Sequence, residues 1–330
     1  MVNTMKQKLI ILFSLLLLGA VVYLISRDLF SSSSKTEKNP CEYNLDKLKA
    51  IDTSLIKYKE IRHFKPSMAK ITGIALDEHS NAYIAGTSGV QVYDKDGKKT
   101  SSFTIDSTAI CIAIGTGKEV YLGIGNHVEK YSHDGKLLKK WDTYKTKGYV
   151  TSIAVRGNDV FVADAGNRLV LHYDENGKLL NTIGKKDKDF IGLIIPSLYL
   201  DVAIDSFDDL WVVNPGKHEL ENFSDKSELR SSWGVPSMQL EGFAGCCNPI
   251  HFCILPNGYF VTYEKGLDRI KLYDQAGKFD CVVASPESIT GKSVYHCSFA
   301  TMVNDLAVDQ QGNIYALDAT SNEVKVFGKK

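Results

Sequence analysis

The stretch "VADAGNRLVLHYDENGK", from Val162 to Lys178, carries the pattern that decides the fold. An apolar run ends at "AD", a short turn follows, and alternating apolar residues then run into "YDENGK". Alternation with period two is typical of β-strands, and Asp or Asn close to Gly supplies the backbone conformations of a tight turn. The stretch therefore predicts two paired strands and a second tight turn that leads to a further strand.

The same pattern recurs in six copies, which begin at Gly73, Cys111, Ser152, Asp201, His251 and Asp305. The copy from Asp201 is degenerate, because it lacks the turn glycine. Alternation such as Val160 and Val162, or Ile270 and Leu272, gives each copy one face that can pack against its neighbour. The copies start roughly 40 to 50 residues apart, which suits a four-stranded propeller blade. We therefore expect an all-β, six-bladed β-propeller. Two unrelated β-sandwich domains would not repeat one pattern six times.

The two ends of the repeat region predict how the ring closes. The last copy stops at Lys330 after three strands, which would leave an exposed edge. Residues Leu55 to Phe64, "LIKYKEIRHF", alternate as a strand does and precede the first copy. We expect this N-terminal strand to close the last blade.

The third copy resembles the NHL repeat, whose signature is an aspartate, then Gly-Asn-(His)-Arg, an apolar alternation and "D-x-x-G-K". The fifth copy has Arg269 in the place of the repeat's arginine, and the sixth has lost it. The resemblance covers residues 55–330 and implies the propeller fold. NHL-type propellers include protein-interaction modules, RNA-binding domains and a few lyases, so no single function follows. "GCCNP" and the residues after it also resemble a subgroup of bacterial envelope NHL-like propellers.

The N-terminus predicts a membrane anchor. Residues 9–26, "LIILFSLLLLGAVVYLIS", carry no charge, and at about 1.5 Å per residue such a helix spans roughly 27 Å. Lys6 and Lys8 precede it and favour a cytoplasmic N-terminus over residues 1–8. We expect a single-pass inner-membrane protein with a stem at 27–54 and a periplasmic propeller at 55–330. A cleaved signal peptide is the alternative, but no small-x-small cleavage site follows the apolar run.

Charge and location narrow the partners. The chain has 39 basic and 39 acidic residues, so no overall field attracts nucleic acid, and we expect no nucleic-acid partner. An extracytoplasmic compartment is usually oxidising, so disulfides can persist there. The chain has seven cysteines, which leaves at least one unpaired. Cys41, in the predicted stem, is the expected odd thiol.

The stretch "GFAGCCNPIHFC", Gly242 to Cys253, is the most unusual in the chain. In propellers, the segments that link blades and the turns between second and third strands emerge on one face around the channel. This topology brings the segments before the fifth and sixth copies to the same face. Three arrangements remain open besides free, buried thiols. They are a disulfide from Cys246 or Cys247 to Cys297, a vicinal Cys246–Cys247 disulfide, and a Zn or Cu site. The candidate metal ligands are Cys246, Cys247, His251, His296 and Cys297.

Catalysis has weaker support in the sequence. No cofactor is expected, and Zn or Cu is the alternative. Metal-dependent propeller hydrolases need Glu, Asn and Asp from several inner strands. The candidates here are Asn248, Asp201, Asn304, Asp305 and Glu264. The first three copies bring only Thr72, Ile110 and Thr151 to equivalent places, which is a poor ligand set.

Polar residues in the predicted turns indicate a mixed-charge rim on the channel face. This rim consists of Asp164, Arg168, His218, Glu264, Lys265 and Arg269. The ligand-binding candidates are Arg168, Cys246, Cys247, Asn248, His251, Glu264, Lys265, Arg269, His296 and Cys297. We expect a module that binds a protein, peptide or glycan. The alternative is a propeller enzyme, either metal-dependent or a thiol redox protein that uses Cys246 and Cys247.

Overall fold

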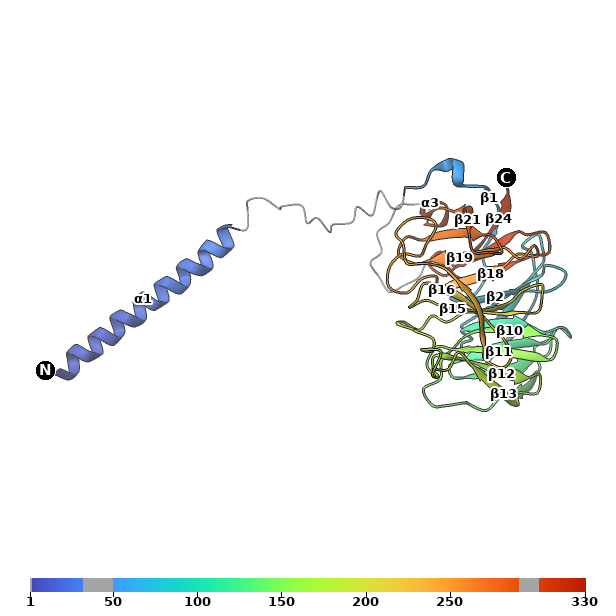
Figure 1. Ribbon diagram of the computed structural model, residues 1–330, viewed down its shortest axis with the longest axis horizontal. Helices are drawn as coiled ribbons and strands as arrows, with labels where there is room; N and C mark the ends of the chain where they lie inside the picture. Colours follow the sequence, from blue (N-terminus) through green and yellow to red (C-terminus); the bar gives the residue numbers. More distant parts are fainter. Residues whose placement is uncertain (1, 32–49, 291–302) are drawn as a thin grey trace. The chain divides into compact units, whose positions relative to one another are not determined.

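The computed structural model describes residues 2–31, 50–290 and 303–330, and the predicted six-bladed propeller is confirmed (Figure 1). The chain separates into two compact units, Met1–Asn44 and Leu45–Lys330. Three residues of the sequence analysis, Cys41, His296 and Cys297, lie outside the described residues. The predicted disulfides to Cys297 therefore cannot be followed in this structure.

The first unit contains helix α1, Val2–Ser31. Its window Ile10–Arg27 has a mean hydropathy of 2.3 and is long and apolar enough to cross a membrane. A signal sequence would pass the same test of length and composition. The helix therefore fits both the anchor and the cleaved signal of the sequence analysis.

The second unit is six antiparallel four-stranded sheets, numbered here as blades 1 to 6 in chain order. Blades 1 to 3 consist of β2 (Ile71–Leu76), β3 (Ala82–Gly86), β4 (Gly89–Tyr93), β5 (Lys99–Thr104), β6 (Cys111–Ile114), β7 (Val120–Ile124), β8 (His127–Tyr131), β9 (Leu137–Lys140), β10 (Val150–Arg156), β11 (Asp159–Asp164), β12 (Leu169–Asp174) and β13 (Leu179–Ile183). Blades 4 to 6 consist of β14 (Val202–Ile204), β15 (Leu210–Asn214), β16 (Glu219–Phe223), β17 (Leu229–Trp233), β18 (His251–Ile254), β19 (Phe260–Glu264), β20 (Arg269–Tyr273), β21 (Phe279–Ala284), β22 (Val303–Val308), β23 (Ile314–Asp318), β24 (Glu323–Lys329) and β1 (Tyr58–Phe64). Two short helices complete the described part, η1 (Thr53–Leu55) and α3 (Pro286–Thr290).

The N-terminal strand closes the last blade, as the sequence predicts. β1 pairs antiparallel with β24, and its register runs from Tyr58 opposite Lys329 to Phe64 opposite Val324. Figure 1 shows the two strands side by side next to the C-terminus. Tyr58 and Phe64 are buried, while the residues between them are exposed or half-buried. The strand therefore satisfies the backbone edge of β24 and anchors itself with an aromatic ring at each end.

Asx turns explain why an aspartate recurs at the end of the first strand of several blades. The Asp77 carboxylate accepts hydrogen bonds from the amides of His79 and Asn81, at 2.9 and 2.8 Å. Asp205 and Asp309 do the same in blades 4 and 6. A side chain that mimics a backbone turn in this way fixes the hairpin geometry.

The turns between third and fourth strands use the same device with a residue of positive φ. Asp174 accepts from the amides of Asn176 and Lys178, both at 2.9 Å, and Gly177 has a φ of 77°. In the degenerate fourth copy Ser227 has a φ of 68° instead. The turn therefore keeps its conformation without the glycine. Its backbone is strained there, because a positive φ is unfavourable for a residue other than glycine.

The core is distributed between the blades. Each of six clusters of buried apolar side chains combines residues from two adjacent blades. Between blades 4 and 5, for example, Trp211 meets Phe260 with ring centroids 4.7 Å apart. Val160 and Val162 belong to the cluster between blades 2 and 3, which confirms the predicted packing face. No blade buries its apolar faces alone, so stability depends on the complete ring.

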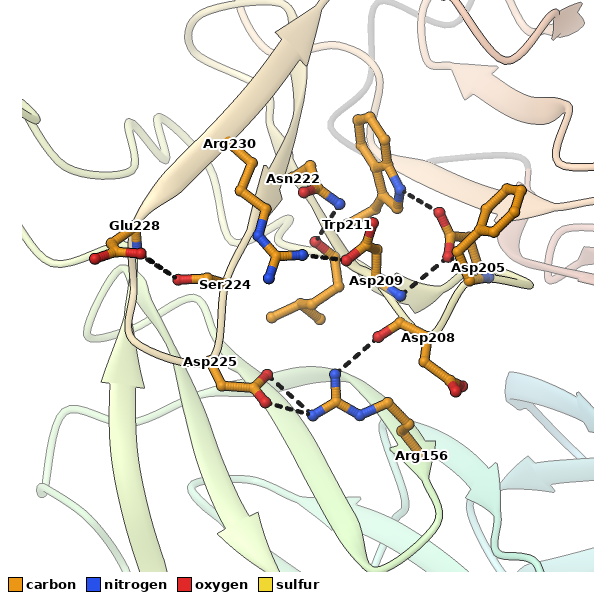
Figure 2. Close-up of polar contacts among 12 residues, drawn as sticks. Arg156, Asp205, Asp208, Asp209, Trp211, Asn222, Ser224, Asp225, Glu228 and Arg230 are labelled. Atoms are coloured by element: carbon orange, nitrogen blue, oxygen red, sulfur yellow. Dashed lines mark hydrogen bonds and ion pairs between the residues drawn. The ribbon is translucent and has the colours of Figure 1, made fainter.

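Polar contacts link blades on the face that carries the turns between first and second strands. Figure 2 shows Arg156 of blade 3 bridging two turns of blade 4. Its guanidinium donates to the Asp208 carbonyl at 2.8 Å and to both oxygens of the Asp225 carboxylate at 2.9 Å. Within blade 4, Arg230 pairs with Asp209. These contacts give the Asp209 and Asp225 carboxylates structural partners on this face.

Deletion of Leu55 to Phe64 tests ring closure. The variant loses the edge pairing of β24 and two buried aromatic rings, so the whole propeller should unfold at a markedly lower temperature, as followed by circular dichroism. Lys59→Ala, at an exposed position of the same strand, is the control and should melt as the wild type does. An unchanged melting temperature in the deletion variant would refute closure by this strand.

Candidate functional site

A cavity of about 270 Å³ lies at the mouth of the central channel. We call the segments that join the last strand of one blade to the first strand of the next the inter-blade segments. The cavity is lined by such segments before blades 1 to 4 and by the first strands of blades 1, 3 and 5. Its lining residues are Lys70, Thr72, Thr108, Ala109, Ile110, Tyr149, Thr151, Leu198, Tyr199, Leu200 and His251. Residues from five blades thus meet here, so the cavity exists only in the closed ring.

The floor of this cavity carries a buried titratable group. His251, the first residue of β18, has a side chain that is 13% exposed, and its Nδ1 lies 3.4 Å from Oδ2 of Asp201. Burial opposes charge on the imidazole, but the hydrogen bond and charge of Asp201 and the charge of Asp305 outweigh it and raise the pKa of His251. The two carboxylates therefore favour the protonated form of His251, whose positive charge they balance.

Two aspartates behind His251 link neighbouring blades. Asp201 accepts the amide of Phe252 at 3.0 Å, from blade 4 to blade 5. Asp305 accepts the amide of Ile74 at 2.9 Å, from blade 6 to blade 1. Burial raises the pKa of Asp305 to about 7, the charge of His251 lowers it, and that of Asp201 raises it further. Both carboxylates were candidates for catalysis in the sequence, and in the structure both have a structural role.

The inter-blade segment before β18 holds the adjacent cysteines at the surface. The Sγ atoms of Cys246 and Cys247 are 3.5 Å apart; Cys246 is exposed, whereas Cys247 is 2% exposed. The neighbouring residues anchor the segment. Asn248 donates to the Ala244 carbonyl at 2.7 Å and accepts the Lys265 amide at 2.9 Å, while His218 contacts the Gly245 carbonyl at 2.8 Å. The two sulfur atoms are thus held together by a rigid backbone.

Lys265 connects the cysteines with the cavity. Its ammonium and the Ser197 hydroxyl contact the Cys247 thiol. Burial raises the pKa of this thiol, but the contacts with Lys265, Ser197 and Cys246 favour the thiolate and lower the pKa overall. The Lys265 ammonium also lies 4.6 Å from the Tyr199 ring, which meets His251 edge-on at 6.3 Å. Cys247, Lys265, Tyr199 and His251 therefore form one continuous chain of contacts.

The predicted mixed-charge rim is wrong for Asp164, His218, Glu264 and Arg269, which are all buried. Glu264 and Arg269 are the pair that supports the cysteine segment, and they are 0% and 1% exposed. Oε2 of Glu264 pairs with Nη2 of Arg269 at 2.8 Å and with Nζ of Lys271 at 3.1 Å, while its Oε1 accepts the Ala244 amide at 2.8 Å. Burial lowers the pKa of Lys271 to about 8, although the charge of Glu264 raises it. A buried carboxylate needs such partners, so these residues support the cysteine segment and offer no surface to a ligand.

The remaining rim residues divide between two roles. Asp164 is buried, accepts the amides of Tyr149 and Asn167 at 2.9 and 3.0 Å, and holds the inter-blade segment before blade 3. Arg168 is exposed in blade 3 and is not part of the chain of contacts around Lys265. Of the predicted candidates, the structure therefore brings Cys246, Cys247, Asn248, Glu264, Lys265 and Arg269 together around one segment, with His251 nearby in the cavity.

No disulfide joins the described cysteines, which are Cys111, Cys246, Cys247, Cys253 and Cys281. Cys111 and Cys253 are buried, as predicted for inner strands, and burial raises the pKa of both thiols. Within residues 2–31, 50–290 and 303–330 no three His, Cys, Asp or Glu side chains converge as metal ligands. His296 and Cys297 of the candidate metal set lie outside these ranges, so Zn or Cu binding stays a prediction.

Sequence reasoning missed four residues that shape the site: Lys70, Ser197, Tyr199 and Lys271. Ser197 and Tyr199 lie in a long inter-blade segment without repeat signature, so only the folded chain shows that they reach blade 5. The role of Lys271 could have been predicted from the sequence, because a lysine at the centre of a strand with apolar neighbours on both sides needs a buried counter-charge.

Comparisons with known proteins support the fold alone. No protein-family model matches the sequence, and no curated protein matches it. Virginiamycin B lyase from Staphylococcus aureus superposes with a TM-score of 0.58 at 12% identity, over 83% of this chain and 100% of that one. The WD40 propeller domain of Doa1 gives 0.54 at 12% identity, over 79% of each chain. A protein of unknown function from Bacteroides thetaiotaomicron gives 0.59 at 13% identity, over 83% of this chain and 76% of that one.

Asp305 predicts a pH-dependent stability. Its pKa of about 7 in the folded protein exceeds the unfolded value near ~4, so the unfolded chain releases this proton first as pH rises. The contribution of Asp305 to stability is therefore complete below pH ~4 and is lost as pH rises through about 7. The difference in the free energy of unfolding between the wild type and Asp305→Asn should change by on the order of 4 kcal/mol across this window, to the disadvantage of the wild type at high pH.

Urea denaturation at several pH values measures this difference. Asp106→Asn, at an exposed position, is the control for the removal of one carboxylate. A constant difference between wild type and Asp305→Asn would contradict the raised pKa.

Proposed function

We propose that this protein is a membrane-anchored, extracytoplasmic binding module whose channel-mouth cavity holds an anionic group of a peptide-like ligand or partner. The observation that carries the proposal is the cavity of about 270 Å³, lined by residues from five blades. Concave sites with apolar walls and a few convergent polar groups are the usual form of a ligand site.

The lining supplies the chemistry for this ligand. Lys70 and the protonated form of His251 provide two cationic groups. Tyr149, Tyr199 and Leu198 provide aromatic and apolar surface beside them, and Leu198 is 53% exposed. A carboxylate next to an apolar or aromatic side chain, as at the end of a peptide, matches this arrangement.

The hydroxyls of the cavity are less available to a ligand. Thr72 Oγ1 donates to the Ala109 carbonyl at 2.7 Å, and Thr151 Oγ1 donates to the Leu200 carbonyl at 2.6 Å. Each hydroxyl therefore donates its hydrogen bond to a neighbouring inter-blade segment and can only accept a hydrogen bond from a ligand. Recognition of an anion thus depends on Lys70 and His251, which makes these two residues the sharpest test of the proposal.

The location rests on α1 and on the residues before it. A helix of this length and hydropathy after Lys6 and Lys8 is typical of a signal anchor that leaves its N-terminus in the cytoplasm. The propeller would then face the extracytoplasmic space on a stem of residues 27–54. Docking of a partner near the membrane is a common task for a domain held in this way.

An enzyme is the second candidate, and one observation favours it. A histidine paired with an aspartate beside a carboxyl group whose pKa is about 7 is suitable for general acid–base catalysis. One structural neighbour is a lyase with the same fold, but at 12% identity the shared fold does not imply that this chain catalyses the same reaction. The same binding experiment separates the two candidates, because an enzyme would return its ligand chemically changed.

Binding of short peptides with a free C-terminal carboxylate tests the proposal. Full-length protein in detergent is screened by thermal shift and calorimetry against such peptides ending in aromatic or apolar residues, with the corresponding amides as matched ligands. The carboxylates should bind at least tenfold more tightly than the amides. Lys70→Met and His251→Gln should each weaken binding about tenfold.

Lys65→Met is the matched control, because Lys65 is exposed in the same segment before β2 and does not line the cavity. Its affinity should equal that of the wild type. Equal binding of carboxylates and amides, or full affinity in Lys70→Met and His251→Gln, would refute an anion site in the cavity.

An alkaline phosphatase fused after Lys330 tests the topology, because this reporter folds only after export. The full-length fusion should be active, whereas the same fusion without residues 9–26 should be inactive. Mass spectrometry of the membrane fraction should also detect peptides from residues 9–26, because an uncleaved anchor keeps them. An inactive full-length fusion would overturn the proposed location, and loss of the N-terminal peptides would favour a cleaved signal.

A further inference from the structure

The adjacent cysteines differ from the other described thiols in three respects. Cys246 is exposed, its sulfur lies 3.5 Å from that of Cys247, and Cys247 contacts a lysine and a serine hydroxyl. Cys111, Cys253 and Cys281 are buried among apolar side chains. Burial raises the pKa of Cys281 to about 12 and that of the other two well above the usual value. Among the described cysteines, the fold thus stabilises a thiolate at Cys247 alone, and the hydrogen bond with Cys247 raises the pKa of Cys246.

The surrounding residues support the two sulfur atoms as a site. On one side, Glu264 holds the Ala244 amide and is itself paired with Arg269 and Lys271. On the other side, Asn248 is hydrogen-bonded to the backbone of Lys265 through both its oxygen and its nitrogen, at 2.9 and 3.1 Å. Three buried charges and a buried amide therefore position the segment from Ala244 to Cys247, in which Gly245 and Cys246 are exposed. Burial of these charges costs desolvation free energy, and such an arrangement is typical of a segment that has a function.

Lys265 is positioned by more than its contact with Cys247. Its Nζ lies 3.4 Å from the Ser197 hydroxyl and 4.6 Å from the Tyr199 ring. A cation held on an aromatic face and beside a hydroxyl is oriented before any thiolate forms. The positive charge thus stays next to the Cys247 sulfur.

We propose that Cys246 and Cys247 form a thiol–disulfide exchange site that accepts the disulfides of small thiols, with Cys246 as the attacking thiol and Cys247 as the resolving thiol. This inference goes beyond the binding function and does not depend on a ligand in the cavity. Exposure assigns the first step to Cys246, since a disulfide can reach only the accessible sulfur. The position of Lys265 assigns the second step to Cys247.

The exchange balances without another reactant. Cys246 loses its proton and attacks one sulfur of the substrate disulfide, so a mixed disulfide forms on Cys246 and the first thiolate leaves. The Cys247 thiolate then attacks the Cys246 sulfur, so the Cys246–Cys247 bond forms and the second thiolate leaves. The two cysteines are oxidised, the substrate disulfide is reduced to two thiols, and the two cysteine protons neutralise the departing thiolates. An excess of a dithiol reverses both steps.

Glutathione disulfide is the probe for this site. Full-length protein in detergent is reduced, freed of reductant and exposed to glutathione disulfide at pH 7, and samples are alkylated at intervals, digested and analysed by mass spectrometry. In the wild type the peptide with Cys246 and Cys247 should lose two hydrogen atoms and resist alkylation. Cys111, Cys253 and Cys281 should stay reduced, so they serve as internal controls.

Variants separate the two roles. Cys247→Ser should accumulate a glutathione adduct on Cys246, whereas Cys246→Ser should form neither an adduct nor a disulfide at this segment. Lys265→Met should slow ring closure about tenfold at pH 7 and shift its pH profile upward, because the loss of a neighbouring cation raises a thiol pKa by about one unit. Lys265→Arg should restore most of the rate.

Lys145→Met is the matched control, because Lys145 also lies over a tyrosine ring, that of Tyr144 at 4.9 Å, but in a different inter-blade segment. It should react as the wild type does. The wild-type measurement needs no variant, so a variant that fails to fold does not affect the main test. Absence of the Cys246–Cys247 disulfide in the folded wild type would overturn the proposal. A disulfide from either cysteine to Cys297, or no adduct in Cys247→Ser, would also overturn it.

Discussion

Antiparallel pairing of β1 with β24 is the constraint on which the rest of the structure depends. Every apolar cluster of the propeller lies between two blades, so each blade needs both neighbours. A chain of six blades that did not close would expose apolar faces at both ends and the edge of β24. The pairing of Tyr58–Phe64 with Glu323–Lys329 removes that edge. Closure of the ring also brings residues of five blades together at one cavity.

Polar ties around the channel complete the ring and distribute its charge unevenly. Thr72 and Thr151 link blades 1 to 2 and 3 to 4 through hydroxyl groups. Asp201 and Asp305 link blades 4 to 5 and 6 to 1 through carboxylates. The side chains that link the blades are thus neutral hydroxyls at two of these interfaces and carboxylates at the other two. His251 lies against the acidic side, and for this reason its protonated form is favoured in a buried position.

The sequence predicts the fold well because the repeat is redundant. Six copies of one pattern overcome the loss of a turn glycine in the fourth, where Ser227 adopts the same positive φ. The sequence also predicts which segments reach the channel face, since propeller topology decides this. It does not predict which polar residues there are free. Glu264 and Arg269 look like rim residues, yet both are buried, because the residue that ends the second strand of a blade ties down the inter-blade segment. Asp164 and Asn214 have the same task in blades 3 and 4.

The side chains that tie down the inter-blade segments differ in length, and this difference explains how the cysteine segment before β18 is held. Asp164 and Asn214 are short, and each accepts an amide of its inter-blade segment directly. Glu264 is longer by a methylene, so it reaches Ala244, two residues before Cys246, and its charge requires Arg269 and Lys271 as buried partners. The segment beyond Ala244 then turns over the blade and returns at Asn248. Of the two cysteines in this turn, Cys246 is exposed and Cys247 is buried, and the hydrogen bonds at Ala244 and Asn248 anchor the turn on both sides. The longer carboxylate thus fixes the segment, and the fixed segment brings two sulfur atoms and a lysine close together.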